Sequence, residues 1–309
     1  MEISTPTVYS GMCDASAAVA LDNKLFVVAN DEDNVLRIYD RDHGGPPVRS
    51  VGLSAFLQVD RQSPEADLEG AARIGDRIYW ITSHGRNPDG KRRASRERFF
   101  GTDIKTNTGR VELVPAGKPC KNLLRDLANE PKLQPFHLDA ASRLAPKLPG
   151  AFNIEGLCST PAGHLLIGFR NPIPRGKALL VPLQNPADVI DGQAPAIGDP
   201  VLLDLGGRGI REISQHEGRY LIVAGSFDGG GKSHLYEWDG RSPTAGDLGK
   251  IHLGKFNPEA VIFYPDKGWK EVQVLSDDGS RVAGGSKGKG LKNQEKKSFR
   301  SLWIPEPAL

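Results

Sequence analysis

Three short segments of the sequence follow one pattern: Asp67-Leu68-Glu69-Gly70-Ala71, Asn153-Ile154-Glu155-Gly156-Leu157 and Asn257-Pro258-Glu259-Ala260-Val261. Each segment begins a unit of strand-like runs, and such internal repetition is typical of repeat architectures. A glutamate that recurs at the same point of successive units predicts a ring of side chains around a common axis, as in a β-propeller. We therefore expect the functional residues to lie on that axis.

Two weaker copies of the pattern fill the remaining gaps, at Asp14-Ala15-Ser16-Ala17-Ala18 and Gly209-Ile210-Arg211-Glu212-Ile213. The glutamate position recurs at spacings of 53, 86, 56 and 48 residues. The long gap contains an insertion from Cys120 to Gly150 whose leucines have helical spacing. Without it the period is about 50 residues, as in propeller blades. The sequence therefore predicts an all-β, five-bladed β-propeller, with six blades as the alternative.

Turn-separated β-rich runs give the first four units four strands each, but the last unit has only three. Ser4 to Tyr9 is the expected fourth strand, because joining the two ends of the chain removes the open sheet edges of an incomplete ring. In blade four we expect the outer strand at Lys250 to Leu253. One propeller domain then covers residues 1–309, with a helical insertion at 120–150 between blades two and three and a flexible basic loop at 281–298.

The composition agrees with a turn-rich globular protein. Of 309 residues, 38% are hydrophobic, and 36 glycines and 23 prolines can supply turns. No run approaches the roughly 18 apolar residues of a membrane span, and Met1 to Asp14 lacks the basic start and apolar stretch of a signal peptide. The three cysteines are odd in number and lack metal-binding spacing. These features predict a cytoplasmic protein with no membrane partner.

Positive charge gathers in the loops that we expect on the motif face, namely His84 to Arg96, Arg170 to Lys177, Ser226 to Lys232 and Gly284 to Lys297. Such a field would concentrate an anionic small-molecule substrate at the channel mouth. The alternatives are a protein partner on this face, or a solvated lysine tract that only keeps the protein soluble. The sequence has no zinc-finger spacing, helix-turn-helix or aromatic-interleaved basic strand, which argues against nucleic acid as a partner.

The ring position itself suggests a cation. Three carboxylates in one narrow channel repel one another unless a cation or hydrogen bonds offset their charge. All-oxygen ligands with open positions for water suit calcium, with magnesium as the alternative. Arg211 offers another solution, a metal-free network in which it bridges Glu155 and Glu259 and joins neighbouring blades. The candidate metal ligands are Ser16, Glu69, Glu155 and Glu259.

A second tier of polar residues follows about fifteen residues after the ring positions, where the second strand of each blade ends. His84 and Asp278 are the candidate general acid or base, because histidine titrates near neutrality and crowding raises the pKa of a carboxyl group. Arg170 is the third candidate catalytic residue, able to stabilise developing charge. For any one of the tier's Asn, Ser and Asp residues, a role in capping strand ends is the alternative. The candidate substrate-binding residues are Arg86, Arg170, Arg211, Asn171 and Asp228.

Several segments carry a resemblance to known propellers: Asp67-Leu68-Glu69-Gly70, Ser83-His84-Gly85-Arg86, Asn153-Ile154-Glu155-Gly156-Leu157, Phe169-Arg170-Asn171-Pro172 and Gly209-Ile210-Arg211. Over most of its length the chain resembles an uncharacterised bacterial propeller family known only as a domain of unknown function. That family is similar in its Asp-x-Glu-Gly strands to propellers with esterase-like phytase activity. More distantly, the sequence is similar to five-bladed calcium-dependent apyrases, which implies a channel cation held by serine and glutamate residues, one per blade. Arg211 departs from the apyrase pattern, which has an uncharged ligand there.

These observations predict a hydrolase that acts on a phosphorylated small molecule at a divalent-cation site in the channel. The first alternative is a non-enzymatic propeller that binds an anionic ligand or a protein partner on its basic face. A third hypothesis, hydrolysis of a glycoside or lactone by two channel carboxylates, needs an aromatic platform. Few aromatic residues lie near the expected mouth, so this hypothesis ranks last.

Overall fold

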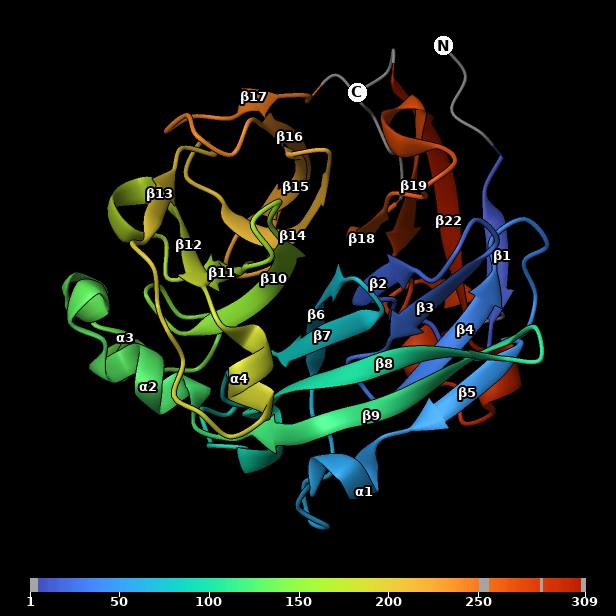
Figure 1. Ribbon diagram of the computed structural model, residues 1–309, viewed down its shortest axis with the longest axis horizontal. Helices are drawn as coiled ribbons and strands as arrows, with labels where there is room; N and C mark the ends of the chain where they lie inside the picture. Colours follow the sequence, from blue (N-terminus) through green and yellow to red (C-terminus); the bar gives the residue numbers. More distant parts are fainter. Residues whose placement is uncertain (1–4, 250–255, 284–285, 307–309) are drawn as a thin grey trace.

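The repeated units form a closed ring of small sheets (Figure 1). The computed structural model describes residues 5–249, 256–283 and 286–306. Within these residues there are five four-stranded antiparallel sheets, and β2, β6, β10, β14 and β18 lie nearest the centre of the ring. The prediction of an all-β, five-bladed propeller is confirmed, and the six-bladed alternative is excluded.

Each blade is a meander whose first strand lines the axis. Blade one consists of β2 (Ala17–Ala20), β3 (Leu25–Ala29), β4 (Val35–Asp40) and β5 (Arg49–Gly52), and blade two of β6 (Leu68–Ile74), β7 (Arg77–Thr82), β8 (Phe99–Asn107) and β9 (Arg110–Cys120). Blade three consists of β10 (Asn153–Ser159), β11 (Leu165–Asn171), β12 (Ala178–Leu183) and β13 (Val201–Leu203), and blade four of β14 (Gly209–His216), β15 (Arg219–Gly225), β16 (His234–Trp238) and β17 (Gly246–Asp247).

Blade five closes the ring with strands from both ends of the sequence. It contains β18 (Pro258–Ile262), β19 (Glu271–Ser276), β22 (Ser298–Pro305) and, on the outside, β1 (Thr7–Ser10). β1 pairs with β22 in antiparallel register, with Thr7 opposite Ser301. The N-terminal strand therefore completes the last blade as predicted, although the predicted start at Ser4 lies outside the described residues.

The outer strand of blade four differs from the prediction. β17 pairs Asp247 with Tyr236 and Gly246 with Glu237, so the fourth strand precedes the apolar run chosen from the sequence. The predicted strand Lys250 to Leu253 lies outside the described residues. A two-residue outer strand pairs through its backbone, and Gly246 and Asp247 are both exposed, so no hydrophobic alternation marks it.

Helical segments occupy the connections and the insertion. Over the residues described, the α-helices are α1 (Ser54–Leu57), α2 (Leu123–Asn129), α3 (Leu138–Ala141) and α4 (Pro186–Ile190), and the 3₁₀ turns are η1 (Ala94–Arg96), η2 (Pro131–Phe136), η3 (Pro174–Gly176), η4 (Gly268–Lys270), η5 (Gly288–Gly290) and η6 (Gln294–Lys296). α2 and α3 bury Leu123, Leu127 and Leu138 against blades two and three. The predicted basic loop at 281–298, called the basic tract below, contains η5, η6 and the paired short strands β20 (Val282–Ala283) and β21 (Ser286–Lys287). The division into one domain, an insertion at 120–150 and a flexible loop at 281–298 stays a prediction.

The Glu-Gly pair recurs in blades two and three, and blade two shows its structural cause. Leu68 pairs with Thr82 and Gly70 with Ile81, so Glu69 is one extra residue, a β-bulge. A Cβ atom on Gly70 would lie 2.8 Å from the Cβ of Leu157, which belongs to the next blade. The bulge turns the glutamate away from the pleat, and the glycine lets the neighbouring blade approach.

Apolar side chains fill the spaces between neighbouring blades. Five clusters of buried residues can be distinguished in the described part of the chain, and each joins two successive blades. The largest, between blades two and three, also includes the leucines of the insertion. The ring is therefore held by packing between blades, which leaves the axis free for polar residues.

Candidate functional site

Four bulges place one charged side chain per blade at one end of the channel. The bulge residues of blades two to five are Glu69, Glu155, Arg211 and Glu259. In blade one the equivalent residue is Ser16, which directly precedes β2 and donates its hydroxyl proton to the carbonyl of Leu68 at 2.6 Å. β-Bulges commonly re-aim a side chain beside a functional site. We call this set of five positions the ring.

Arginines neutralise the part of the ring that blades three to five form. Arg211 forms an ion pair with Glu259, and its Nε atom lies 3.9 Å from a carboxylate oxygen of Glu155. Arg170, at the end of β11, pairs with the other oxygen of Glu155 and donates to the carbonyl of Ser226 at 3.2 Å. Burial lowers the pKa of Arg211, yet a guanidinium remains charged at neutral pH. This half of the ring has the arrangement of the metal-free alternative.

Glu69 stands in the ring without such a partner. No hydrogen bond or ion pair joins its carboxylate to another residue in the described ranges. Glu69 is half-buried, and desolvation by the surrounding protein atoms raises its pKa well above the usual range, with further contributions from the charges of Asp67 and Glu155. A cation placed beside Glu69 would lower its pKa again.

A second group of carboxylates lies near Glu69 and holds a lysine. Lys289 Nζ lies 3.0 Å from Asp14 and 3.3 Å from Asp31. Burial raises the pKa of Asp14 to about 7, together with the neighbouring Asp277. Burial also raises the pKa of Asp31 well above its usual value, and Asp31 Oδ1 has no hydrogen-bond partner among the residues described. We call Asp14, Asp31, Asp67 and Glu69 the acidic half of the mouth.

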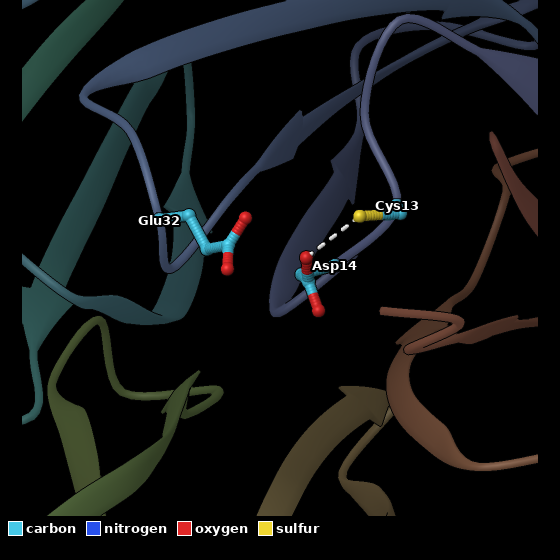
Figure 2. Close-up of side chains that lie close together, drawn as sticks. All are labelled: Cys13, Asp14 and Glu32. Atoms are coloured by element: carbon cyan, nitrogen blue, oxygen red, sulfur yellow. Dashed lines mark hydrogen bonds between the residues drawn. The ribbon is translucent and has the colours of Figure 1, made fainter. Parts of the chain in front are cut away.

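Figure 2 shows the place where Cys13, Asp14 and Glu32 turn toward one another. In the described part of the chain they form the only group of three or more His, Cys, Asp or Glu residues whose ligand atoms all lie within 4.8 Å of one another. The Cys13 thiol donates to Asp14 at 2.9 Å, and burial raises the pKa of Cys13, so sulfur stays protonated here. Lys297 Nζ lies 3.2 Å from Glu32. Lys289 thus contacts two carboxylates of the acidic half, and Lys297 contacts the neighbouring Glu32.

Three other predicted residues have structural partners. Asp278 accepts two hydrogen bonds at 2.6 Å from the guanidinium of Arg300. Asn171 donates to the carbonyls of Pro146 and Leu148 and so ties the end of the insertion to blade three. Asp228 is exposed, and hydrogen bonds from Ser226 and the Gly230 amide lower its pKa. Their predicted roles in catalysis and substrate binding stay predictions.

His84 and Arg86 line a different cavity from the channel. This cavity has a volume of about 340 Å³, lies against the insertion, and its walls do not include Glu69, Glu155 or Arg170. His84 Nδ1 lies 2.8 Å from the carbonyl of Thr82, so that nitrogen carries the proton, and burial lowers the pKa of His84 to about 4. Arg86 donates to the carbonyl of Ser142 at 2.7 Å.

Sequence reasoning missed the importance of Asp14 and Lys289. A signal for Asp14 was present, because the residue two places before the ring position is Asp14, Asp67, Asn153 and Asn257 in four of the five repeats. In three of these repeats that residue forms a bond at the mouth: Asp14 with Lys289, Asn153 with Glu155, and Asn257 with Glu259. Lys289 had no such signal, since its partners lie more than 250 residues away in the sequence.

No helix of the described residues is long and apolar enough to cross a membrane. No curated protein matches the sequence. The fold is similar to the glutaminyl cyclase of Myxococcus xanthus, at a TM-score of 0.48 and 13% identity over 97% of this chain and 94% of that one. It is also similar to the PQQ-bound aldose sugar dehydrogenase of Streptomyces coelicolor, at a TM-score of 0.44 and 11% identity over 96% and 98% of the two chains.

A GH43 glycoside hydrolase gives a TM-score of 0.48 at 12% identity, with 98% of this chain and 52% of that chain covered. Likeness at this level concerns the fold alone. At the level of sequence, residues 95–250 match a family described as a protein of unknown function, DUF3616. That match covers half of the sequence, and the chain belongs to this family.

Proposed function

We propose that the protein is a hydrolase of a phosphorylated small molecule and that it binds a divalent cation in the acidic half of the channel mouth. The proposal rests on the surroundings of the Glu69 carboxylate. Its carboxylate is turned to the axis by a bulge, has no partner among the described residues, and is raised in pKa by desolvation and nearby carboxylates. A carboxylate in such a place gains from a cation.

The donor set fits a hard cation better on one side of the ring than on the other. Glu69 and Asp31 offer carboxylate oxygens, which calcium and magnesium prefer. Glu155 and Glu259 are paired with arginines and would have to release them before they could bind metal. We therefore propose Glu69 as the first ligand and Asp31 as the second, in place of the complete set of Ser16, Glu69, Glu155 and Glu259. The carboxylate oxygens of Glu69, Asp31 and Asp14 do not all lie within 4.8 Å of one another, so Asp14 is not proposed as a ligand. Calcium is the first choice and magnesium the second.

The two halves of the mouth suit a phosphate ester in complementary ways. A bound divalent cation would polarise a phosphoryl group and help to activate water. Arg170 and Arg211 lie in the opposite half, and they would stabilise the charge of the anionic substrate once it displaces Glu155 and Glu259 from them. Asp14, with a pKa raised to about 7, can exchange a proton near neutral pH and could accept one from water. The resemblance of the repeated motifs to phytase and apyrase propellers also supports phosphoester chemistry.

Calorimetric titration of the chelator-treated protein with calcium tests the proposal. We expect one saturable site that Glu69→Gln abolishes and that the exposed control Glu295→Gln keeps. Phosphomonoesters are then screened for hydrolysis with and without calcium, and Glu69→Gln should remove the calcium-dependent rate. Absence of saturable binding of either calcium or magnesium would overturn the cation site. Binding without turnover of any phosphoester would overturn the hydrolase.

A non-enzymatic propeller that binds an anion or a protein partner is the alternative. The contacts of Lys289 and Lys297 count against the basic tract as its docking surface, because both ammonium groups face carboxylates of the same chain. Lys292 is exposed, and its ammonium group forms no ion pair with another described residue. A partner that binds through the tract should therefore lose affinity in Lys292→Ala, which leaves the channel mouth unchanged.

A further inference from the structure

The cavity between blade two and the insertion is lined mainly by polar residues, and many of these are basic. Its volume is about 340 Å³, and its walls come from the loop that joins β7 to β8 and from the helical insertion. Five basic side chains line it: Arg86, Arg92, Lys121, Arg125 and Arg143. A cavity of this size holds a small organic molecule, and its charge indicates the sign of that molecule.

Three of the five cations are already neutralised by carboxylates. Arg92 binds both oxygens of Glu97, Arg125 contacts Asp126, and Arg143 contacts Asp139. Arg86 and Lys121 face no carboxylate in the described part of the chain and bond only to uncharged oxygens. Among the described residues around the cavity, two positive charges therefore remain without a counter-ion.

Arg86 is already held in position for an anion. Its Nε donates to the carbonyl of Ser142 at 2.7 Å and its Nη1 to the carbonyl of Gly90 at 3.0 Å. The two bonds fix the guanidinium plane between the loop and the insertion, while no bond from Nη2 is found within the described residues. A guanidinium that is ordered before binding loses little freedom when it meets a phosphate.

We propose that this cavity is a second binding site, separate from the channel, for a small phosphate monoester in its doubly charged form. Two unpaired cations match the two negative charges of such a phosphate near neutral pH. The cavity is larger than a phosphate ion needs, and Asn122, Asn129 and Leu124 line the remaining space, where the organic part would lie. The ligand would bridge the loop and the insertion.

Titration calorimetry at low salt with glycerol 2-phosphate, and separately with inorganic phosphate, tests the proposal. We expect one saturable site for glycerol 2-phosphate that weakens about tenfold or more in Arg86→Gln and in Lys121→Gln, since each removes a charged hydrogen-bond donor. Lys91→Gln is the matched control, because Lys91 is exposed in the same loop but does not line the cavity, and it should change affinity less than twofold.

Two variants from different chain segments keep the test informative if Arg86→Gln is poorly folded. Equal weakening in Lys91→Gln would mean diffuse attraction and would overturn the site. Loss of binding in Arg211→Gln, with Arg86→Gln and Lys121→Gln unchanged, would move the phosphate to the channel and also overturn it. Equal affinity for inorganic phosphate would restrict the ligand to the anion and overturn the role of the organic part. None of these outcomes depends on calcium or turnover.

Discussion

Lys289 supplies a cation to the acidic half of the mouth from within the chain. Its ammonium group lies near Asp14, Asp31 and Glu32, at 3.0, 3.3 and 3.9 Å. An ammonium group compensates carboxylates as a metal ion does, but with one charge and without fixed geometry. A divalent cation that binds beside Glu69 therefore competes with Lys289.

Replacement of Lys289 should strengthen cation binding. In Lys289→Met we expect calcium affinity to rise about tenfold, because the competing charge a few ångströms away is removed. The comparison is made by calorimetry at pH 8, above the pKa of about 7 at which Asp14 loses its proton. Lys292→Met, an exposed lysine of the same tract, serves as control. Unchanged affinity in Lys289→Met would contradict competition.

His84 should make stability depend on pH. Folding lowers its pKa from 6.5 to about 4, so the unfolded chain takes up a proton first as the pH falls through this window. Stability is then complete above about pH 6.5 and is lost toward pH 4, by about 3 kcal/mol if the shift acts alone. Urea unfolding at pH 7 and pH 4.5 should show a smaller loss in His84→Asn than in the wild type.

The control for this prediction is His137→Asn. His137 shares the left-handed backbone of His84, with φ of 50° against 52°, but its side chain is exposed. Asparagine tolerates this conformation in both places. His137→Asn should keep the pH dependence of the wild type, and a reduced dependence in both variants would assign the effect to the backbone instead.

At the level of strands, the glycines beside the bulges allow neighbouring blades to pack closely. A Cβ atom on Gly156 would lie 2.8 Å from Cγ2 of Ile210 and 3.2 Å from Cα of Gly168. Gly156→Ala should cost about 1–3 kcal/mol in the free energy of unfolding, because blades three and four must separate. Gly52→Ala in β5, where nothing lies within 4 Å, should be neutral or stabilising. Similar denaturant midpoints for the two variants would refute this account.

The repeated motif predicted the bulges correctly because a bulge depends on neighbouring residues of one strand. A bulge residue followed by a small residue is a property of one strand and its neighbour, so Glu69, Glu155 and Glu259 could be found from the sequence. The partners of the ring are long-range. The repeat placed Arg211 and Glu259, 48 residues apart, at the same point of neighbouring blades, so their contact was predicted as one alternative, but the repeat could not choose between this contact and a metal ion. The sequence predicted His84 at the channel because it follows β7. In the structure His84 has a left-handed backbone, with φ of 52°, and lines the cavity beside the insertion.

For the whole ring, a charged pair joins the first and last blades. Arg41 of blade one binds both carboxylate oxygens of Asp266 in blade five at 2.8 Å, and its guanidinium lies 4.7 Å from the ring centre of Tyr264. The Arg41 side chain is 9% exposed. This pair crosses the place where the ring closes, next to the strand pair β1 and β22.

Loss of the closing pair should weaken the entire molecule. Arg41→Met is expected to reduce the free energy of unfolding by about 2 kcal/mol, because Asp266 loses both charged donors. The comparison is Arg49→Met, which breaks the more exposed pair with Glu112 between blades one and two and should cost less than about 1 kcal/mol. Chemical denaturation measures both free energies of unfolding. Equal losses in the two variants would mean that the pair at the ring closure stabilises the protein no more than the pair between blades one and two.

Pairing of β1 with β22 also sets an order of events during synthesis. Thr7 leaves the ribosome long before Ser301, its partner in the sheet. At about 5–20 residues per second, the first strand waits roughly 15–60 s for the strand that receives it. β1 is therefore made long before the strand that it pairs with, and the propeller can close only after Ser301 has been made.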